Sequence, residues 1–392
     1  DVEHRQRQRT LLADRLWQFT TAPATGLPVL GLVLAGIFTF LFVVGDWLSV
    51  GFSALWTAYA SPAIRWPFVT LLGNNALSRT LLWGFDAGIN AALAIGIPYV
   101  LTFYFLLALL EDTGYMNAVA FLTDRVMHKM GLHGRAVIPL VAGAGCNVPA
   151  ILGTRVLGTM RERIIASTLI VLTPCSARTA VILGAVAVTA GWPWALAVYG
   201  VSALVALGTG IGLDRFLPGS GTGLVMEMFP FRRPTLLPMM KRTWGHFREF
   251  VVVATPIVVG GSIVLGGLYE TGLLWALARP LRPIMEGWLG LPAVAGLTLI
   301  VAVLRKELAL QLLVTLAIAQ YGPQASNLLS FMQPHQIVVY ALVNTLYVPC
   351  VATISILARE LGWRRALLIS AFTVALALLV GGMARGFFTL IG

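Results

Sequence analysis

The chain has 392 residues, of which 58% are hydrophobic and 11% are charged, and its mean hydropathy is +0.85. A soluble domain carries roughly 25% charged residues, so this composition excludes a water-soluble fold of this size. The net charge is +11, but the basic residues fall in the connections between apolar runs, as the positive-inside bias of membrane proteins requires. We therefore predict a protein that contacts membrane lipid and does not bind nucleic acid.

The apolar runs predict an all-α, polytopic transmembrane bundle with its N-terminus on the cytoplasmic side. Several runs approach the roughly 20 residues that cross a bilayer, namely Leu27–Val44, Ala91–Leu110, Val251–Leu268 and Ala366–Val380. The expected segments are a cytoplasmic lead-in or linker (1–26), a first transmembrane segment with an external loop (27–90), a first repeat (91–228), a basic amphipathic cytoplasmic segment (229–249) and a second repeat (250–392). Basic residues around Trp244 and Phe247 predict a surface helix for 229–249, with a solvated loop as the alternative.

An internal repeat relates the two repeat segments. Each contains a span, an acidic-Thr-Gly element, a Gly-Leu element and a Pro-Cys element in that order. These elements are Asp112-Thr113-Gly114, Gly131-Leu132 and Pro174-Cys175 in the first repeat, and Glu270-Thr271-Gly272, Gly290-Leu291 and Pro349-Cys350 in the second. The charges orient the two leading spans in opposite directions. We therefore predict inverted repeats, whose transport sites lie at the repeat interface near the membrane midplane.

The run 143–150 contains two glycines and a proline, which break a helix and free its backbone polar groups. Such backbone is tolerated at membrane depth only where protein buries it or where it lines a cavity. Cys146 and Asn147 are therefore candidate metal ligands, which offer a thiol and an amide oxygen. The alternative is a tight helix-packing motif around a small buried cysteine.

Two further breaks place a cysteine, Cys175 or Cys350, directly after a proline. Ser176 adds a hydroxyl beside the first, and Arg178 is an expensive charge in an apolar stretch, although a snorkelling anchor would also explain it. The three cysteines of the chain are too few, and too apolar in setting, for a disulfide framework. Their shared setting predicts a thiol-lined path for a soft or borderline cation such as Fe²⁺, Zn²⁺ or Cu⁺.

The remaining candidates are the charged residues Glu111, Asp112, Lys306 and Glu307. Carboxylates would attract a divalent cation, and Lys306 could pair with one of them in a resting state. The alternative is an interfacial cap at the end of a span, which we favour for Asp112. No lysine follows a glycine, so the sequence contains no P-loop, and no histidine spacing or hydrolytic triad indicates catalysis. We predict a transporter that is not an enzyme and binds no cofactor itself.

Together these motifs resemble the ferrous iron transport protein B family, in family order from about residue 27 to the C-terminus. No single motif is specific, but their combination is. The motifs are Leu110-Glu111-Asp112-Thr113-Gly114, Gly131-Leu132-His133-Gly134, Gly145-Cys146-Asn147-Val148-Pro149-Ala150, Cys175-Ser176-Ala177-Arg178, Lys306-Glu307 and Pro349-Cys350-Val351-Ala352-Thr353. Ala144 and residues 179–182 depart from the family pattern beside the expected path.

The resemblance implies an inner-membrane permease that imports Fe²⁺ through two gate-type repeats with broken or re-entrant helices. By this resemblance, the residues expected to form the metal site are Cys146, Cys175 and Cys350. Glu111 and Lys306-Glu307 are expected to assist them. In the family a GTP-binding domain precedes this region and a small accessory protein often assists. We therefore expect GTP to act through a separate or missing cytoplasmic domain.

Two alternative functions stay open from the sequence. The same scaffold would serve Mn²⁺, another divalent metal or a nucleoside as cargo. The chain would also suit a non-transporting membrane scaffold or sensor. Assembly as a homo-oligomer is left open as well.

Overall fold

The computed structural model describes residues 17–391, except for 74, 220–230, 232, 233, 274, 275, 277, 278, 304, 305, 307, 322, 323, 325 and 326. Every regular element in this part of the chain is a helix, which confirms the predicted all-α class. Six helical stretches are long and apolar enough to cross a membrane, and two bent helix pairs raise this to as many as eight. The protein is therefore a multi-pass membrane protein. The six stretches are Ala24–Thr70, Met160–Ala187, Trp192–Phe216, Leu236–Leu268, Pro334–Leu361 and Trp363–Leu390.

The chain divides into two compact units. Unit 1 consists of Asp1–Ala54, Leu93–Ile170 and Gly208–Val253, and unit 2 consists of Leu55–Ala92, Val171–Leu207 and Ala254–Gly392. In the described part of the chain, five helices continue from one unit into the other, namely α2 (Pro23–Leu55), α4 (Ala76–Ile95), α9 (Met160–Leu172), α11 (Trp192–Phe216) and α12 (Leu236–Glu270).

Unit 1 is built around a sharp turn between two apolar helices. Its main helices are α2 (Pro23–Leu55), α5 (Thr102–Asp112), α6 (Tyr115–His128), α7 (Val137–Gly145), α8 (Asn147–Gly153) and most of α9 (Met160–Leu172). Gly114, at a φ of 81°, separates α5 from α6, and the stretches on either side of this turn meet at 86°. A residue other than glycine would rarely adopt that φ. A small core beyond the turn joins Tyr115 and Val119 of α6 to Val137 of α7.

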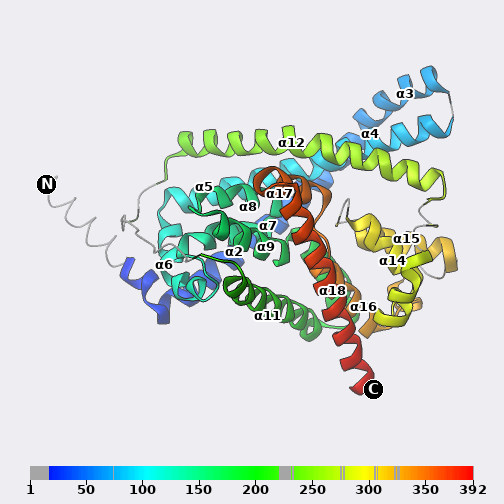
Figure 1. The fold of residues 1–392 in the computed structure, drawn as a ribbon. Coiled ribbons are helices and arrows are strands. Elements are labelled where there is room, and N and C mark those ends of the chain that lie inside the picture. Colours follow the sequence, from blue (N-terminus) through cyan, green and yellow to red (C-terminus); the bar gives the residue numbers. More distant parts are fainter. Residues whose placement is uncertain are drawn as a thin grey trace. The chain divides into compact units, whose positions relative to one another are not determined.

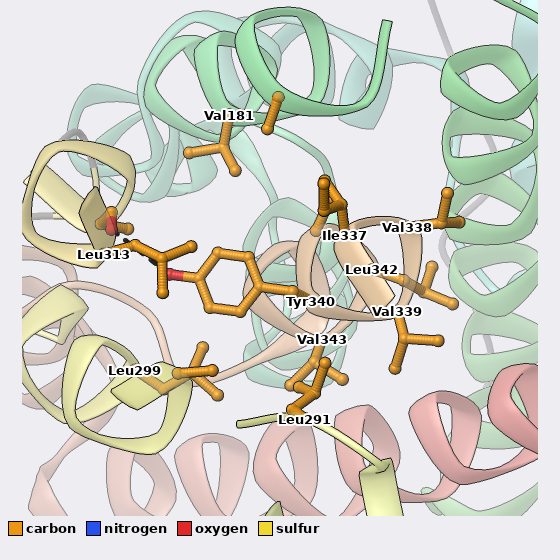
Figure 2. Close-up of a cluster of buried hydrophobic side chains, with 14 of the residues drawn as sticks. Val181, Leu291, Leu299, Leu313, Ile337, Val338, Val339, Tyr340, Leu342 and Val343 are labelled. Atoms are coloured by element: carbon orange, nitrogen blue, oxygen red, sulfur yellow. Dashed lines mark hydrogen bonds between the residues drawn. The ribbon is translucent and has the colours of Figure 1, made fainter. Parts of the chain in front are cut away.

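Unit 2 contains the larger apolar core. Its main helices are α3 (Ser61–Leu72), α10 (Ser176–Val181), α14 (Ala293–Ala302), α15 (Leu308–Tyr321), α16 (Pro334–Leu346), α17 (Val351–Leu361) and α18 (Trp363–Ile391). Helix α16 lies within this core, and its side chains from Ile337 to Leu346 are all buried. Figure 2 shows Tyr340 pointing from α16 toward Leu313 of α15 and Leu299 of α14. Because apolar residues of this core surround most of α16, it packs as a buried helix, and its polar side chains Tyr340 and Asn344 are buried with it.

The expected external loop within 27–90 is helical through most of its length. Helix α2 continues into a π-helix (Trp56–Ala60) and α3, and α4 returns after a short connection (Figure 1). Asp86 of α4 is 9% exposed and accepts hydrogen bonds from Trp56 Nε1 (3.0 Å), Ser61 Oγ (2.5 Å) and Arg65 Nε (3.2 Å). A buried carboxylate requires such donors, so this network ties α4 to the π-helix and α3.

The basic segment 229–249 is joined to the span that follows it. From Leu236 onward it forms the first half of α12, which continues unbroken to Glu270 (Figure 1). Lys241, Arg242 and Arg248 are exposed on this half, whereas Arg232 and Arg233 lie outside the described residues. The described part of this segment is thus helical from Leu236 as part of a span-length helix, and its position on the cytoplasmic surface stays a prediction.

The two repeat segments share a local order of elements. A left-handed glycine, Gly131 or Gly290, with φ of 68° or 67°, comes before α7 or α14. Each of these helices breaks and is followed by a second helix, α8 or α15. Next comes a longer stretch, Met160–Ala187 or Pro334–Leu361, which is interrupted at a Pro-Cys pair. The order agrees with the internal repeat seen in the sequence, and the inversion of the repeats stays a prediction.

Candidate functional site

All three cysteines lie where a helix is interrupted. Cys146 separates α7 from α8 in an extended conformation, with φ −150° and ψ 132°. Cys175 directly precedes α10, and Cys350 directly precedes α17. None of the three forms a disulfide with another described residue, and all three are of intermediate exposure. Each break leaves helix-end carbonyls and amides without intrahelical partners, so each thiol lies beside backbone that can bind a ligand.

The Pro-Cys breaks fall near the centres of their apolar stretches. Each stretch, Met160–Ala187 and Pro334–Leu361, has 28 residues, and Cys175 and Cys350 lie close to the midpoint of each. Non-helical backbone at this depth must be buried in protein or line a cavity. The position therefore fits the mid-membrane breaks that transporters use for their sites.

In unit 1, Asn147 connects the break after α7 to α9. The side chain is 5% exposed. With its amide nitrogen facing the carbonyls, it donates to Gly143 O and Ile170 O, each at 3.2 Å. The amide nitrogen thus satisfies carbonyls on both elements, as a buried polar side chain requires. Asn147 holds the Cys146 break in place, and the metal-ligand role of both residues stays a prediction.

In unit 2, Arg178 of α10 is fully buried. Its Nη1 donates to the carbonyls of Val171 and Thr173 at the end of α9, and its Nη2 donates to Tyr347 O at 3.2 Å. A snorkelling arginine would place its guanidinium at the membrane surface. Complete burial excludes that alternative, and the guanidinium instead joins the break after α9 to the break after α16.

Lys306 is also buried, with 4% of its surface exposed. Its Nζ donates to Asn344 O at 3.0 Å and to Tyr347 O at 3.4 Å. A backbone hydrogen bond also joins the residue after α14 to the start of α17, because Val351 N donates to Val303 O at 2.8 Å. The break after α14 therefore packs against the break after α16.

The Tyr347 carbonyl is the point where these contacts meet, since it accepts from both Arg178 and Lys306. Both cations lie within electrostatic range of the Cys175 and Cys350 thiols. Among the described residues, neither cation forms an ion pair with a carboxylate. Unit 2 thus collects two thiols, two buried basic side chains and the helix-end carbonyls that accept hydrogen bonds from them at one junction of broken helices.

The predicted acidic residues belong to unit 1 or lie outside the described residues. Glu111 is exposed at the end of α5, with 3.9 Å between its Oε1 and Arg242 Nη1. Asp112 accepts from Thr235 N at 2.6 Å and Thr235 Oγ1 at 3.1 Å, and its role as an interfacial cap stays a prediction. Glu307 lies outside the described residues. Within the described part of the chain, no group of three or more His, Cys, Asp or Glu side chains is arranged to hold a metal.

Ser176 is the first residue of α10, directly beside Cys175, and is half-buried.

The sequence reasoning missed two groups that the structure places at the junction, the Tyr347 carbonyl and Asn344. A single amide within the apolar run Ile337–Leu346 was the available signal for Asn344. No sequence signal identifies a particular carbonyl, because every residue has one.

These features define a class of protein. An all-helical, multi-pass membrane protein whose central helices break at buried polar groups has the architecture of a membrane transporter. Two family comparisons are more specific. Residues 94–189 and 251–364 match the family described as "Nucleoside recognition" (Gate), and residues 195–245 match "Ferrous iron transport protein B C terminus".

Proteins with related sequences agree with this result. A relative from Methanocaldococcus jannaschii, named "Fe(2+) transporter FeoB", is 30% identical over 346 residues, which cover 79% of this chain and 51% of the relative. Relatives of the same name from Salmonella typhimurium and Escherichia coli are 33% identical over 252 residues, covering 63% of this chain and 32% of each relative. The chain belongs to the ferrous iron transport protein B family and corresponds to its membrane region. It spans about half the length of the archaeal relative and about a third of the bacterial ones. No solved structure matches the chain.

Replacing Arg178 by lysine should destabilise the protein. Lysine is a compact charge without the planar fork of donors, so it cannot serve the carbonyls of Val171, Thr173 and Tyr347 together. One unsatisfied buried acceptor costs about 1–3 kcal/mol, and we expect a loss of that size in the free energy of unfolding. Thermal unfolding in detergent measures it, with exposed Arg364→Lys as the control. An unchanged unfolding temperature for Arg178→Lys would show that the junction does not depend on the guanidinium.

Proposed function

We propose that this chain carries Fe²⁺ across a membrane along a path that passes Cys146, Cys175 and Cys350. The observation that carries the proposal is the position of all three thiols at helix breaks, two of them near the centres of apolar stretches. The relatives' printed name, Fe(2+) transporter, supports the same cargo. Fe²⁺ is a borderline cation, and thiols select for such ions over Mg²⁺ and Ca²⁺.

The backbone breaks add oxygen ligands to the thiols. Carbonyls released at the ends of α9 and α16 lie next to Cys175 and Cys350, respectively. A cation that moves past each break would exchange water for sulfur and carbonyl oxygen. Conduction needs sites that bind well enough to admit the ion and weakly enough to release it. A mixed set of few ligands suits that requirement better than a closed cage of carboxylates.

A nucleoside is the second candidate cargo, because the family that matches 94–189 and 251–364 is described as "Nucleoside recognition". A nucleoside site should offer aromatic stacking and paired amides, whereas the breaks here offer thiols. The match of residues 195–245 to an iron-transport family and the names of the relatives also favour the metal. Both cargoes are therefore included in the uptake experiment below.

We also propose that a GTPase domain or protein on the cytoplasmic side supplies the energy for transport. We place the N-terminus and the basic half of α12 on the cytoplasmic side of a cell inner membrane. Lys241 and Arg248 are exposed there beside exposed Trp244. This surface would contact a GTPase domain or protein, and anionic lipid is the alternative partner for clustered cations.

Uptake by purified protein tests the cargo. Proteoliposomes that contain only this chain should accumulate radiolabelled Fe²⁺ in preference to Mg²⁺ and to uridine. Cys175→Ser and Cys350→Ser should each lower the uptake rate by on the order of tenfold, because a hydroxyl is a poor ligand for a borderline cation. Cys146→Ser should also lower Fe²⁺ affinity while leaving thermal stability nearly unchanged. Ser355→Ala is the control, since that hydroxyl bonds to Val351 O within its own helix. Uridine uptake without Fe²⁺ uptake would replace the iron proposal.

Charge reversal tests the cytoplasmic contact. Lys241→Glu with Arg248→Glu should leave insertion and Fe²⁺ binding intact but remove GTP-stimulated uptake in native membrane vesicles, where the natural partner is present. Arg364→Glu, an exposed change in α18, serves as the control. A variant that fails to insert, or that loses only its binding to anionic liposomes, would identify the cluster as a topology or lipid signal.

A further inference from the structure

Helix α16 presents one polar face to the broken pair α14 and α15. Tyr340 projects from that face (Figure 2), and its hydroxyl lies 3.0 Å from Thr298 Oγ1 and 3.4 Å from Ala309 O. Residues four apart on a helix lie on the same face. Asn344 therefore follows Tyr340 by one turn on the side that faces the break between α14 and α15, where Lys306 lies.

The Asn344 side chain is fully buried, yet neither its Oδ1 nor its Nδ2 has a hydrogen-bond partner among the described residues. Leaving a buried amide unpaired costs stability. Each such group in a folded protein needs an explanation, and a missing ligand is one. Its own backbone carbonyl, by contrast, is occupied by the Lys306 ammonium.

The Lys306 ammonium donates to two backbone carbonyls, and the second of them, Tyr347 O, also accepts from Arg178 Nη2. The ammonium lies 3.0 and 3.4 Å from two carbonyl oxygens of one helix end, and within electrostatic range of the Cys175 and Cys350 thiols. No carboxylate in the described part of the chain pairs with it. The acceptors that surround the ammonium are the same types of oxygen and sulfur ligand that bind a divalent metal.

We propose that Lys306 is a tethered substitute for the transported cation. In the empty protein its ammonium fills a cation site made by the Asn344 and Tyr347 carbonyls. When a divalent cation enters, the ammonium swings away and the Asn344 amide oxygen becomes a ligand together with those carbonyls. The inference rests on the proposed metal transport, and it adds a coordinating residue, Asn344, and a built-in competitor, Lys306.

A tethered competitor explains two properties of the junction. The carbonyls at the end of α16 keep a hydrogen-bond donor, Lys306, when no cargo is bound. The break therefore neither collapses nor needs water to hydrogen-bond these carbonyls. Occupancy by cargo is also limited, because the incoming ion must displace a charge that cannot diffuse away. Weak, displaceable binding is what passage through the site requires.

Lysine could instead be a permanent cap that satisfies the last carbonyls of α16, as basic side chains often do. Lys306→Met separates the two roles, because it keeps an unbranched side chain only one atom shorter and removes the ammonium. The tethered-cation role predicts that anaerobic ⁵⁵Fe²⁺ binding to the purified protein tightens by on the order of tenfold, the equivalent of one charged hydrogen bond. Fe²⁺ should also raise the unfolding temperature of Lys306→Met more than that of the wild type. A permanent cap predicts unchanged or weaker binding, and that result would overturn the proposal. Lys129→Met, at an exposed lysine, is the matched control.

Asn344→Leu tests the site without touching Lys306, and it keeps the proposal testable if Lys306→Met does not fold. The side chains are similar in size, and the change removes an unpaired buried amide, so the Fe²⁺-free protein should unfold at the same or a higher temperature. Fe²⁺ affinity should nevertheless fall by on the order of tenfold, because one oxygen ligand is lost. Asn90→Leu, in α4, is the control. A stable Asn344→Leu protein with wild-type affinity would exclude Asn344 as a ligand.

The outcomes also separate this inference from the proposed function. Wild-type Fe²⁺ uptake together with unchanged affinities in Lys306→Met and Asn344→Leu would overturn the inference and leave iron transport standing. Absence of Fe²⁺ binding and uptake in the wild type and both variants would overturn the proposed function, and the inference with it.

Discussion

The two hydrogen bonds that the carbonyl oxygen of Tyr347 accepts, from Arg178 and from Lys306, hold together the broken helices in the described part of unit 2. Helix α16 ends at Leu346, and the carbonyls of its last turn then lack intrahelical donors inside an apolar protein. Arg178 and Lys306 supply donors to the same oxygen from two other breaks. Three interrupted segments are thereby joined by two buried cations. The broken backbone, which would be a defect in an ordinary membrane helix, becomes a fixed junction.

This junction has a direct chemical consequence. Backbone oxygens that already hold an ammonium and a guanidinium are placed for positive charge, and the Cys175 and Cys350 thiols add sulfur within electrostatic range. No carboxylate in the described part of the chain forms an ion pair with Arg178 or Lys306. Selectivity would then come from sulfur and carbonyl oxygen, and the protein's own cations would keep the empty site from binding its cargo too strongly. The proposed transport and the proposed role of Lys306 are two results of the same arrangement.

Part of this arrangement follows from the sequence, and part does not. Glycine and proline in apolar runs predict the breaks at Cys146, Cys175 and Cys350, because these residues disrupt helices wherever they lie. The sequence did not indicate the Asp86 network that ties α4 to the π-helix and α3, because its hydrogen bonds join residues 21 to 30 positions apart. The partners of Arg178 could not be predicted either. Its bond to Tyr347 joins residues 169 positions apart, and neither charge nor periodicity identifies one carbonyl among many.

X-ray absorption at the iron edge of the Fe²⁺-loaded protein tests the central claim most directly, because it reports which elements bind the metal. The account predicts a mixed shell of sulfur and oxygen around Fe²⁺ in the wild type. The sulfur contribution should disappear in the Cys175→Ser, Cys350→Ser double variant, while Ser355→Ala keeps it. A shell of oxygen and nitrogen alone in the wild type, or a sulfur signal that survives in the double variant, would contradict a metal site at this junction of broken helices.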